Sequence, residues 1–486
     1  MRRWGMSNAC VSSVRGEFAG VETDPRLVRR IGLVCDRLSA APRVGFPQAL
    51  KTTAETEAFY RLLRNSRLKY SALVESHAAQ TVGRMTPGRV VRVVHDTTEF
   101  AYETEAEREG LGRRSRTSSA QVFFAHVSLA VGLDAMPLGV LAAECWARTS
   151  APRGNRKMGG AELSKLAERE SDRWWRQVEA TAKRIGDRTE AIHLMDREGD
   201  SYRIFSKLME RERRFVVRMA RDRVVFMEDA QTGDEEKLRL SEALSTLPTR
   251  VTREVPLSRR RASPAPRGAK THPARTSRTA TLALSAGTIE LNRPVYLTAE
   301  PERLTVNVVY VQELDPPPDA TAVSWVLVTT EPIDTIANVE AIVDHYRARW
   351  IIEELFKALK TGCSFEERQL ESFDTLTKAL ALFFPIAWQM LVVRAVSRSD
   401  PDAPAERVLT PTQIKVLQHY QRQKMPLVSP RAVDALYAIA GLGGHLKQNG
   451  PPGWQTLAAG MQELILMADA WDAGARAAKS SDPNDQ

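Results

Sequence analysis

Cysteine is scarce in this chain of 486 residues, which contains four in total. No two of them form a CxxC pair, and they are scattered at Cys10, Cys35, Cys145 and Cys363. This spacing excludes a disulfide framework and a cysteine-ligated zinc site. It is typical of proteins from a reducing compartment.

Long hydrophobic segments are also missing. The longest apolar segment runs from Ala379 to Val393 and is interrupted by Pro385 and Gln389. Because a membrane-spanning helix needs ~20 apolar residues, we expect a buried core helix here and no association with a membrane. The first residues, MRRWGMSNACVSS, lack the apolar core of a secretory signal.

Signatures of nucleotide binding and of covalent catalysis are not evident. The glycine-rich turn at residues 441–453 lacks the lysine pattern of a P-loop. No Ser-His-Asp or Cys-His set stands out either. We therefore expect neither a nucleotide cofactor nor a covalent protein nucleophile.

Positive charge is concentrated in two zones, although the formal net charge is only +9. Residues 1–90 hold 15 Lys and Arg against 7 Asp and Glu, which gives +8. Residues 250–278 hold 9 basic residues against 1 acidic residue, again +8. Basic zones of this kind indicate phosphate-backbone binding, but a solvated charged surface gives the same count.

The hydrophobic pattern predicts a mixed α/β architecture. The first ~75 residues have helical spacing, with a cap at Asp24-Pro25 and a capping-box pattern from Thr52 to Glu55. Strand patterns begin at residue 89, and helix and strand patterns alternate after residue 160. Residues 224–328 form a β-rich segment that includes an Arg- and Pro-rich loop, 258–278. One long helix at about 335–360 and further helices from about residue 376 complete the chain.

Two carboxylates each follow an apolar strand pattern. Asp96 closes the strand of RVVRVVHD, and Asp196 closes that of AIHLMD. Carboxylates at neighbouring strand ends can converge, and Mg²⁺ prefers oxygen ligands. Taken singly, either Asp is equally typical of a turn or a helix cap.

Four polar side chains share one face of the predicted helix. Tyr346, Arg349, Glu353 and Lys360 fall within an arc of about 60° at 100° per residue. The face combines a phenol, a guanidinium, a carboxylate and an ammonium group. An exposed polar face stabilised by ion pairs is the alternative interpretation.

These motifs together resemble the IS-four group of DDE transposases, and in particular the Tn-five transposase branch. The Tyr-Arg-Glu-Lys pattern in YRARWIIEELFKALKTG is similar to the signature helix of that group. The segments HDTTEF and MDREGDSY resemble its two aspartate segments, and SWVLVTTEPI resembles the strand that carries a base-stacking tryptophan. FPQALKTTAETEAFYRLLRN is similar to its DNA-binding module, and GGHLKQNGPPGW to its dimerisation domain.

The resemblance implies an RNase H-like catalytic core that contains a β-rich insertion. This core is flanked by an N-terminal helical DNA-binding domain and a C-terminal helical domain. Asp96, Asp196 and Glu353 would then be the catalytic triad and would bind two Mg²⁺ ions, with Mn²⁺ as a substitute. The implied domains are residues 1–75, residues 76–372 with the insertion at about 224–328, and residues 373–486.

The resemblance also implies the groups that contact DNA. Tyr346, Arg349 and Lys360 would contact the backbone of the transposon end, and Arg218 matches another contacting position. Trp325 would stack against a base flipped out of the duplex. Such a flipped base belongs to a mechanism that cuts the second strand through a DNA hairpin.

We therefore expect a transposase that binds the terminal inverted repeats of an insertion element, excises the element and joins it to target DNA. It would act as a homodimer in the synaptic complex, in the cytoplasm of a bacterium and associated with the nucleoid. Two alternatives remain open at this point. One is an RNase H-like nuclease without strand transfer, and the other is a catalytically inactive DNA-binding regulator.

Overall fold

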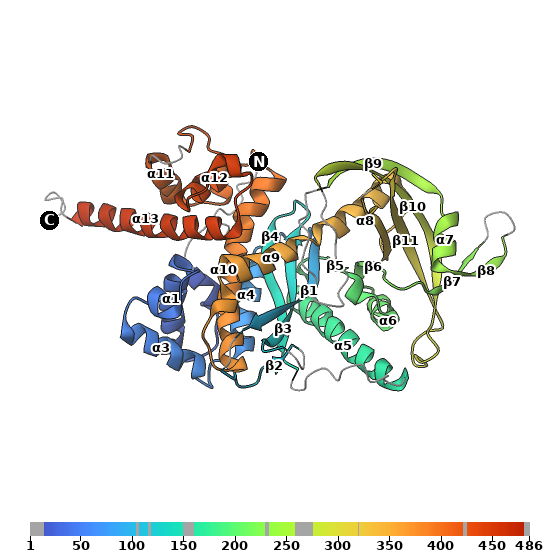
Figure 1. The fold of residues 1–486 in the computed structure, drawn as a ribbon, viewed down its shortest axis with the longest axis horizontal. Coiled ribbons are helices and arrows are strands. Elements are labelled where there is room, and N and C mark those ends of the chain that lie inside the picture. Colours follow the sequence, from blue (N-terminus) through green and yellow to red (C-terminus); the bar gives the residue numbers. More distant parts are fainter. Residues whose placement is uncertain are drawn as a thin grey trace. The chain divides into compact units, whose positions relative to one another are not determined.

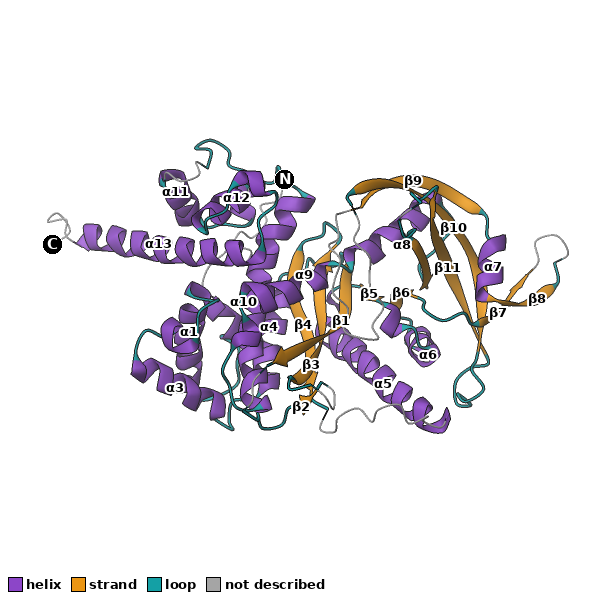
Figure 2. Ribbon diagram, in the orientation of Figure 1, coloured by secondary structure: helices purple, strands orange, loops and turns teal. Residues whose placement is uncertain are grey.

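The computed structural model describes residues 14–103, 106–114, 118–148, 160–228, 233–257, 276–318, 320–420 and 425–480. Contacts divide the chain into two compact units. Unit 1 comprises residues 1–157, 179–190 and 350–486, and unit 2 comprises residues 158–178 and 191–349. The secondary structure is mixed α/β, as predicted (Figure 2).

Unit 1 begins with helices that were expected from the capping signals. Asp24 caps the first long helix by accepting a hydrogen bond from the Arg26 amide, and Thr52 caps the third by accepting from the Glu55 amide. The elements of this segment are η1 (Val14–Phe18), α1 (Pro25–Ala40), α2 (Phe46–Ala49), α3 (Thr53–Arg64) and α4 (Tyr70–Gly83). Of these, α1, α3 and α4 are labelled in Figure 1.

Four antiparallel strands follow in unit 1. The central strand β3 (Gln121–Gly132) pairs on one side with β1 (Val91–Tyr102) along its whole length. On its other side it pairs with the short β2 (Gly112–Arg113) and with β4 (Pro137–Trp146). The end of α5 (Gly160–Ile185) and η2 (Gly186–Arg188) also belong to this unit.

The remaining part of unit 1 is helical. Its elements are α9 (Ile351–Lys357), η4 (Ala358–Gly362), η5 (Phe365–Glu367), α10 (Phe373–Ser399), η6 (Ala405–Arg407), α11 (Pro411–His419), α12 (Ala432–Leu442), η7 (Lys447–Asn449) and α13 (Trp454–Ser480). By length and composition α10 could cross a membrane, but 89% of its apolar window is buried inside the structure. It packs against α3, α4 and β4, which confirms the predicted core helix.

Two buried cations join the N-terminal helices to the segment around α10. The guanidinium of Arg368 donates to the carbonyls of Pro42 and Val44. The ammonium of Lys378 lies 2.9 Å from the Leu63 carbonyl and so satisfies the end of α3. The N-terminal helices are thus an integral part of unit 1.

Unit 2 is built on a sheet that is mainly antiparallel. The strands follow the order β5 (Ala191–Met195), β6 (Arg214–Arg218), β12 (Ser324–Thr329), β11 (Arg303–Leu314), β10 (Arg278–Asn292), β7 (Val224–Glu228) and β8 (Glu235–Arg239), and β9 (Thr249–Leu257) also pairs with β10. Strands β5 and β6 run parallel to each other. The helical elements are the first part of α5, η3 (Arg197–Gly199), α6 (Tyr202–Glu210), α7 (Leu240–Thr246) and α8 (Ile336–Ala348).

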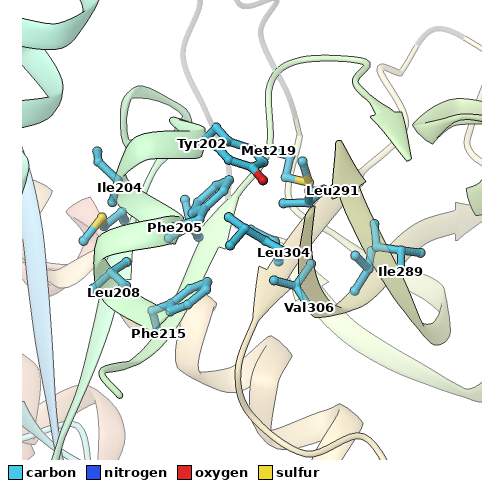
Figure 3. Packing of buried hydrophobic residues seen from close by; sticks show 14 of the residues in the cluster. Tyr202, Ile204, Phe205, Leu208, Phe215, Met219, Ile289, Leu291, Leu304 and Val306 are labelled. Carbon is cyan, nitrogen blue, oxygen red and sulfur yellow. The ribbon is translucent and has the colours of Figure 1, made fainter. Parts of the chain in front are cut away.

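A hydrophobic cluster holds α6 against this sheet. Figure 3 shows Phe205 and Leu208 of α6 beside Phe215 of β6, with Leu304 and Val306 of β11 facing them. All five side chains are buried. The segment predicted to be β-rich therefore shares one core with β6 and α6. Most of the Arg- and Pro-rich loop, residues 258–275, lies outside the described residues.

The predicted long helix from residue 335 to residue 360 is wrong. Helix α8 ends at Ala348, and α9 begins at Ile351. Between them the Arg349 amide bonds to the Tyr346 carbonyl at 3.0 Å, which is an i→i−3 bond that tightens the turn. After α9 comes a π turn in which the Cys363 amide bonds to the Ala358 carbonyl, at 2.8 Å. Uniform rotation of 100° per residue therefore does not apply across this segment.

Candidate functional site

Unit 1 contains Asp96, Glu353 and Lys360. Asp96 lies in the middle of β1, opposite Val127 of β3, and not at the end of the strand as predicted. The strand continues because residues 97–102 maintain the pairing with β3 as far as Tyr102. Asp96 is buried, and one of its carboxylate oxygens accepts from the Thr97 amide at 2.8 Å.

Glu353 lies on α9, which packs against β1. Its neighbour Glu354 has a different environment, with Arg394 at 3.2 Å, Arg398 at 3.5 Å and Lys357 at 2.9 Å. Burial raises the pKa of Glu354, but these three cations outweigh it and hold the pKa below the ordinary value of 4.5. Glu354 is therefore an internal counter-ion for basic side chains, whereas Glu353 points about 100° away from it around the helix.

Glu99, the other carboxylate near this site, is also bound to a cation. Its side chain accepts from Arg114 at 2.5 and 2.8 Å. Asp96 and Glu353, the two proposed ligands in unit 1, lie on β1 and α9, which pack together.

Unit 2 contains Asp196, which follows β5 as predicted. Its side chain accepts from the Glu198 amide at 2.8 Å and caps the short helix η3. The capping role that a lone Asp after a strand suggests is therefore present. The side chain of Asp200, which follows η3, is buried, accepts from the Ala220 and Arg221 amides and pairs with Arg223.

Four of the predicted DNA-contacting side chains come together in unit 2, although they are distant in the sequence. Trp325 lies on β12, and its ring centre is 5.5 Å from that of Tyr346 on α8. Arg218, at the end of β6, lies close to Tyr346 and donates to the Ser324 carbonyl at 3.0 Å. The Arg349 guanidinium lies 6.0 Å from the Tyr346 ring centre.

The position of α8 explains this grouping. The helix begins at the cap Thr335 and packs against β6 and β12, the strands that carry Arg218 and Trp325. Asp344 of the same helix forms an ion pair with Arg253 of β9 at 2.5 Å. Tyr346 is thereby fixed beside the ends of both strands.

Positive charge is strongly concentrated in this cluster. Burial lowers the pKa of Arg218, and the neighbouring guanidinium groups of Arg197 and Arg349 lower it further. An anion placed among these groups would raise the pKa of Arg218 again, because an opposite charge favours the charged guanidinium. Arg197 was not singled out from the sequence, although its position directly after Asp196 was a usable signal.

A divalent cation requires several oxygen ligands grouped around one point. Three carboxylates are a suitable donor set for Mg²⁺ or Mn²⁺. Among the residues that the structure describes, however, no three His, Cys, Asp or Glu side chains are grouped so that they could hold one ion. Asp96 and Glu353 belong to unit 1, and Asp196 belongs to unit 2.

Two protein-family models match this chain. Residues 13–68 match the family described as transposase DNA-binding, and residues 170–386 match the transposase DDE domain. The second range includes Asp196 and Glu353 but begins after Asp96. The first range covers the N-terminal helices α1, α2 and α3.

One solved structure is a distant neighbour of the chain. It is a cryo-EM structure of the piggyBac transposase synaptic complex with hairpin DNA, with 10% identity and a TM-score of 0.35 over 81% of this chain and 74% of that chain. A likeness this weak carries no argument about fold or function. The two family matches are the finding that bears on identity: the chain matches a transposase DNA-binding domain and a transposase DDE domain, which supports a DDE transposase.

Proposed function

We propose that this transposase resembles the Tn-five branch of the IS-four group. In this proposal it binds the terminal inverted repeats of an insertion element, excises the element by metal-dependent cleavage through a hairpin, and inserts it by strand transfer. The observation that carries the proposal is the cluster of Arg218, Trp325, Tyr346 and Arg349 in unit 2. It combines closely spaced guanidinium groups with two aromatic rings, which suits a phosphate backbone with an unstacked base.

The proposed catalytic groups are Asp96, Asp196 and Glu353 in an RNase H-like core. Two divalent ions bound by these carboxylates would activate the attacking hydroxyl and stabilise the leaving 3′ oxygen. The chain's own cations would hold the phosphates around the scissile bond. Arg349 would do so from the end of α8 and Lys360 from the π turn after α9.

Trp325 would hold the flipped base while the strand bends into a hairpin. Its ring is half-buried, and its edge-to-face contact with Tyr346 keeps the orientation fixed. Base stacking on an aromatic side chain contributes about 1–3 kcal/mol. Tyr346 has a second partner in Arg218, so one phenol connects the proposed base site with the proposed phosphate site.

The other parts of the chain have proposed roles as well. Residues 1–75 would recognise the inverted repeat, and the exposed Arg26 and Arg29 of α1 are available for phosphates. Residues 76–372, with the insertion at 224–328, would form the catalytic domain. Residues 373–486 would join two subunits in the synaptic complex, where the exposed Leu466 and Trp471 of α13 offer apolar surface.

The test uses the DNA that flanks the gene. We expect short terminal inverted repeats bordered by direct duplications of the target.

A second test uses the purified protein. With Mg²⁺ it should nick a labelled repeat, convert it to a hairpin and join the end to a plasmid. Cleaved ends without joined products would support the nuclease alternative, and bound but uncut ends would support the inactive regulator.

A further inference from the structure

We propose that Glu366 is a positioning residue for Lys360, which it orders before DNA arrives. The inference rests on the proposed function, in which Lys360 holds a phosphate of the transposon end. Glu366 belongs to the short helix η5, and it does not form part of the sequence pattern that contains Lys360. All of the contacts that support the inference lie within unit 1.

The Lys360 ammonium is held at three points. It donates to the backbone carbonyl of Glu99 on β1 and lies 5.4 Å from the centre of the Phe100 ring. It is also 3.7 Å from a carboxylate oxygen of Glu366. That distance is too long for a hydrogen bond, so the contribution of Glu366 is the attraction between opposite charges.

Glu366 is itself fixed to the same strand. The oxygen that faces Lys360 accepts from the Ala101 amide at 3.0 Å. The adjacent Phe365 is buried, with its ring centre 5.2 Å from that of Phe100. The carboxylate is therefore a fixed group on the edge of β1, and the flexible Lys360 side chain is ordered by it.

The backbone on either side is irregular. Lys360 lies in the π turn, and Ser364 adopts a left-handed conformation, with φ of 47°. Both features are uncommon, and both are maintained only where surrounding contacts fix them. A regular helix from α9 onward would not return the chain to β1 at Glu366. These irregularities direct both Lys360 and Glu366 toward the same strand.

Lys360 and Glu366 are both about one-third exposed, with side-chain exposures of 30% and 32%. The pair is thus accessible to a phosphate, and its own stability is modest because solvent screens exposed ion pairs. One ammonium proton is used by the Glu99 carbonyl. The others can reach a phosphate oxygen without breaking that bond.

The experiment measures end binding and single-turnover cleavage for the full chain. Glu366→Ala should slow cleavage roughly 10- to 100-fold, the range expected when a positioned group is displaced, while the Kd for the inverted repeat changes less than about threefold. Glu366→Gln should recover part of the rate, because its amide oxygen can still accept from Ala101. Glu367→Ala is the matched control, since it removes the same charge from an exposed position in the same turn.

The decisive measurement is a double-mutant cycle with Lys360→Met. If Glu366 acts through Lys360, Glu366→Ala should have little further effect in the Lys360→Met background. Additive losses, or tighter DNA binding by Glu366→Gln, would overturn the inference. These outcomes require a wild-type protein that cleaves, so a failure of the proposed function itself would be visible separately.

Discussion

A largely buried carboxylate near the start of the chain, with a side chain 12% exposed, gives the sharpest stability prediction. Glu17 of η1 accepts from Arg84, which directly follows α4, at 2.7 and 3.2 Å and pairs with the Nδ1 atom of His77 at 2.6 Å. His77 Nε2 accepts from the Val140 amide, at 3.0 Å. The imidazole is therefore neutral, with its proton on Nδ1 and donated to Glu17. Consistent with this, burial lowers the pKa of His77.

The magnitude follows from the pKa of Glu17. Burial alone would raise it, but the hydrogen bond from His77 and the charge and hydrogen bonds of Arg84 lower it from 4.5 to about 2. At about 1.4 kcal/mol for each tenfold change in acidity, this corresponds to roughly 3 kcal/mol of folding free energy. Because the folded-state pKa is depressed, the contribution is present above about pH 4.5 and is lost as the pH falls toward 2.

We therefore expect Glu17→Gln to lower the free energy of unfolding by roughly 3 kcal/mol at pH 7. Urea titration at pH 7 and at pH 3 measures the loss, which should shrink at the lower pH. Glu57→Gln is the control, because Glu57 is exposed and lies 4.0 Å from Arg61, and its loss should stay below about 1 kcal/mol. An equal loss for Glu17→Gln at both pH values would refute the reasoning.

Three further predictions concern DNA. Alanine at any one of the three proposed triad positions should abolish cleavage and leave end binding within about threefold in a gel-shift assay, because the substitution removes a proposed metal ligand and not a DNA contact. A variant that still cuts with Mg²⁺ would exclude that residue from the triad. Trp325→Ala should slow hairpin formation by roughly 10-fold or more while first-strand nicking is preserved, consistent with the loss of about 1–3 kcal/mol of stacking; equal slowing of both steps would argue against a base-stacking role. Replacing both Arg26 and Arg29 by alanine should weaken end binding. It should also reduce the slope of log K against log salt concentration by up to about 2, because binding then releases about one counter-ion fewer for each phosphate contact that is lost. An unchanged slope would place the DNA elsewhere.

The capping signals and the apolar helix pattern were sufficient to predict much of unit 1. Asp24 and Thr52 cap α1 and α3 because their side chains satisfy amides of the first turn, a local interaction that the sequence displays directly. The burial of α10 likewise follows from its composition. Asp96 shows the limit of such reasoning, because the extent of β1 is determined by its pairing partner β3, which lies outside the local pattern.

The grouping in unit 2 could be predicted only through the resemblance. Arg218, Trp325 and Tyr346 lie on a strand, another strand and a helix, and only the pairing of β6 with β12 and the packing of α8 bring them together. Glu366 could not be found in this way, because its relation to Lys360 depends on a π turn and a left-handed residue. Neither feature follows from the spacing of polar side chains.

The division of the predicted helix changes how its motif should be understood. Tyr346 and Arg349 belong to unit 2, whereas Glu353 and Lys360 belong to unit 1, and the tightened turn at residues 346–349 lies where the two units meet in the sequence. The four residues are thus not a single rigid face. In the proposed function the phenol and the guanidinium act together with Trp325, and the carboxylate acts together with Asp96. Substitutions within each pair of motif residues should therefore show stronger coupling in cleavage assays than substitutions taken from different pairs, because residues that share partners couple most strongly. Equal coupling for all combinations would indicate that the motif acts as one continuous face after all.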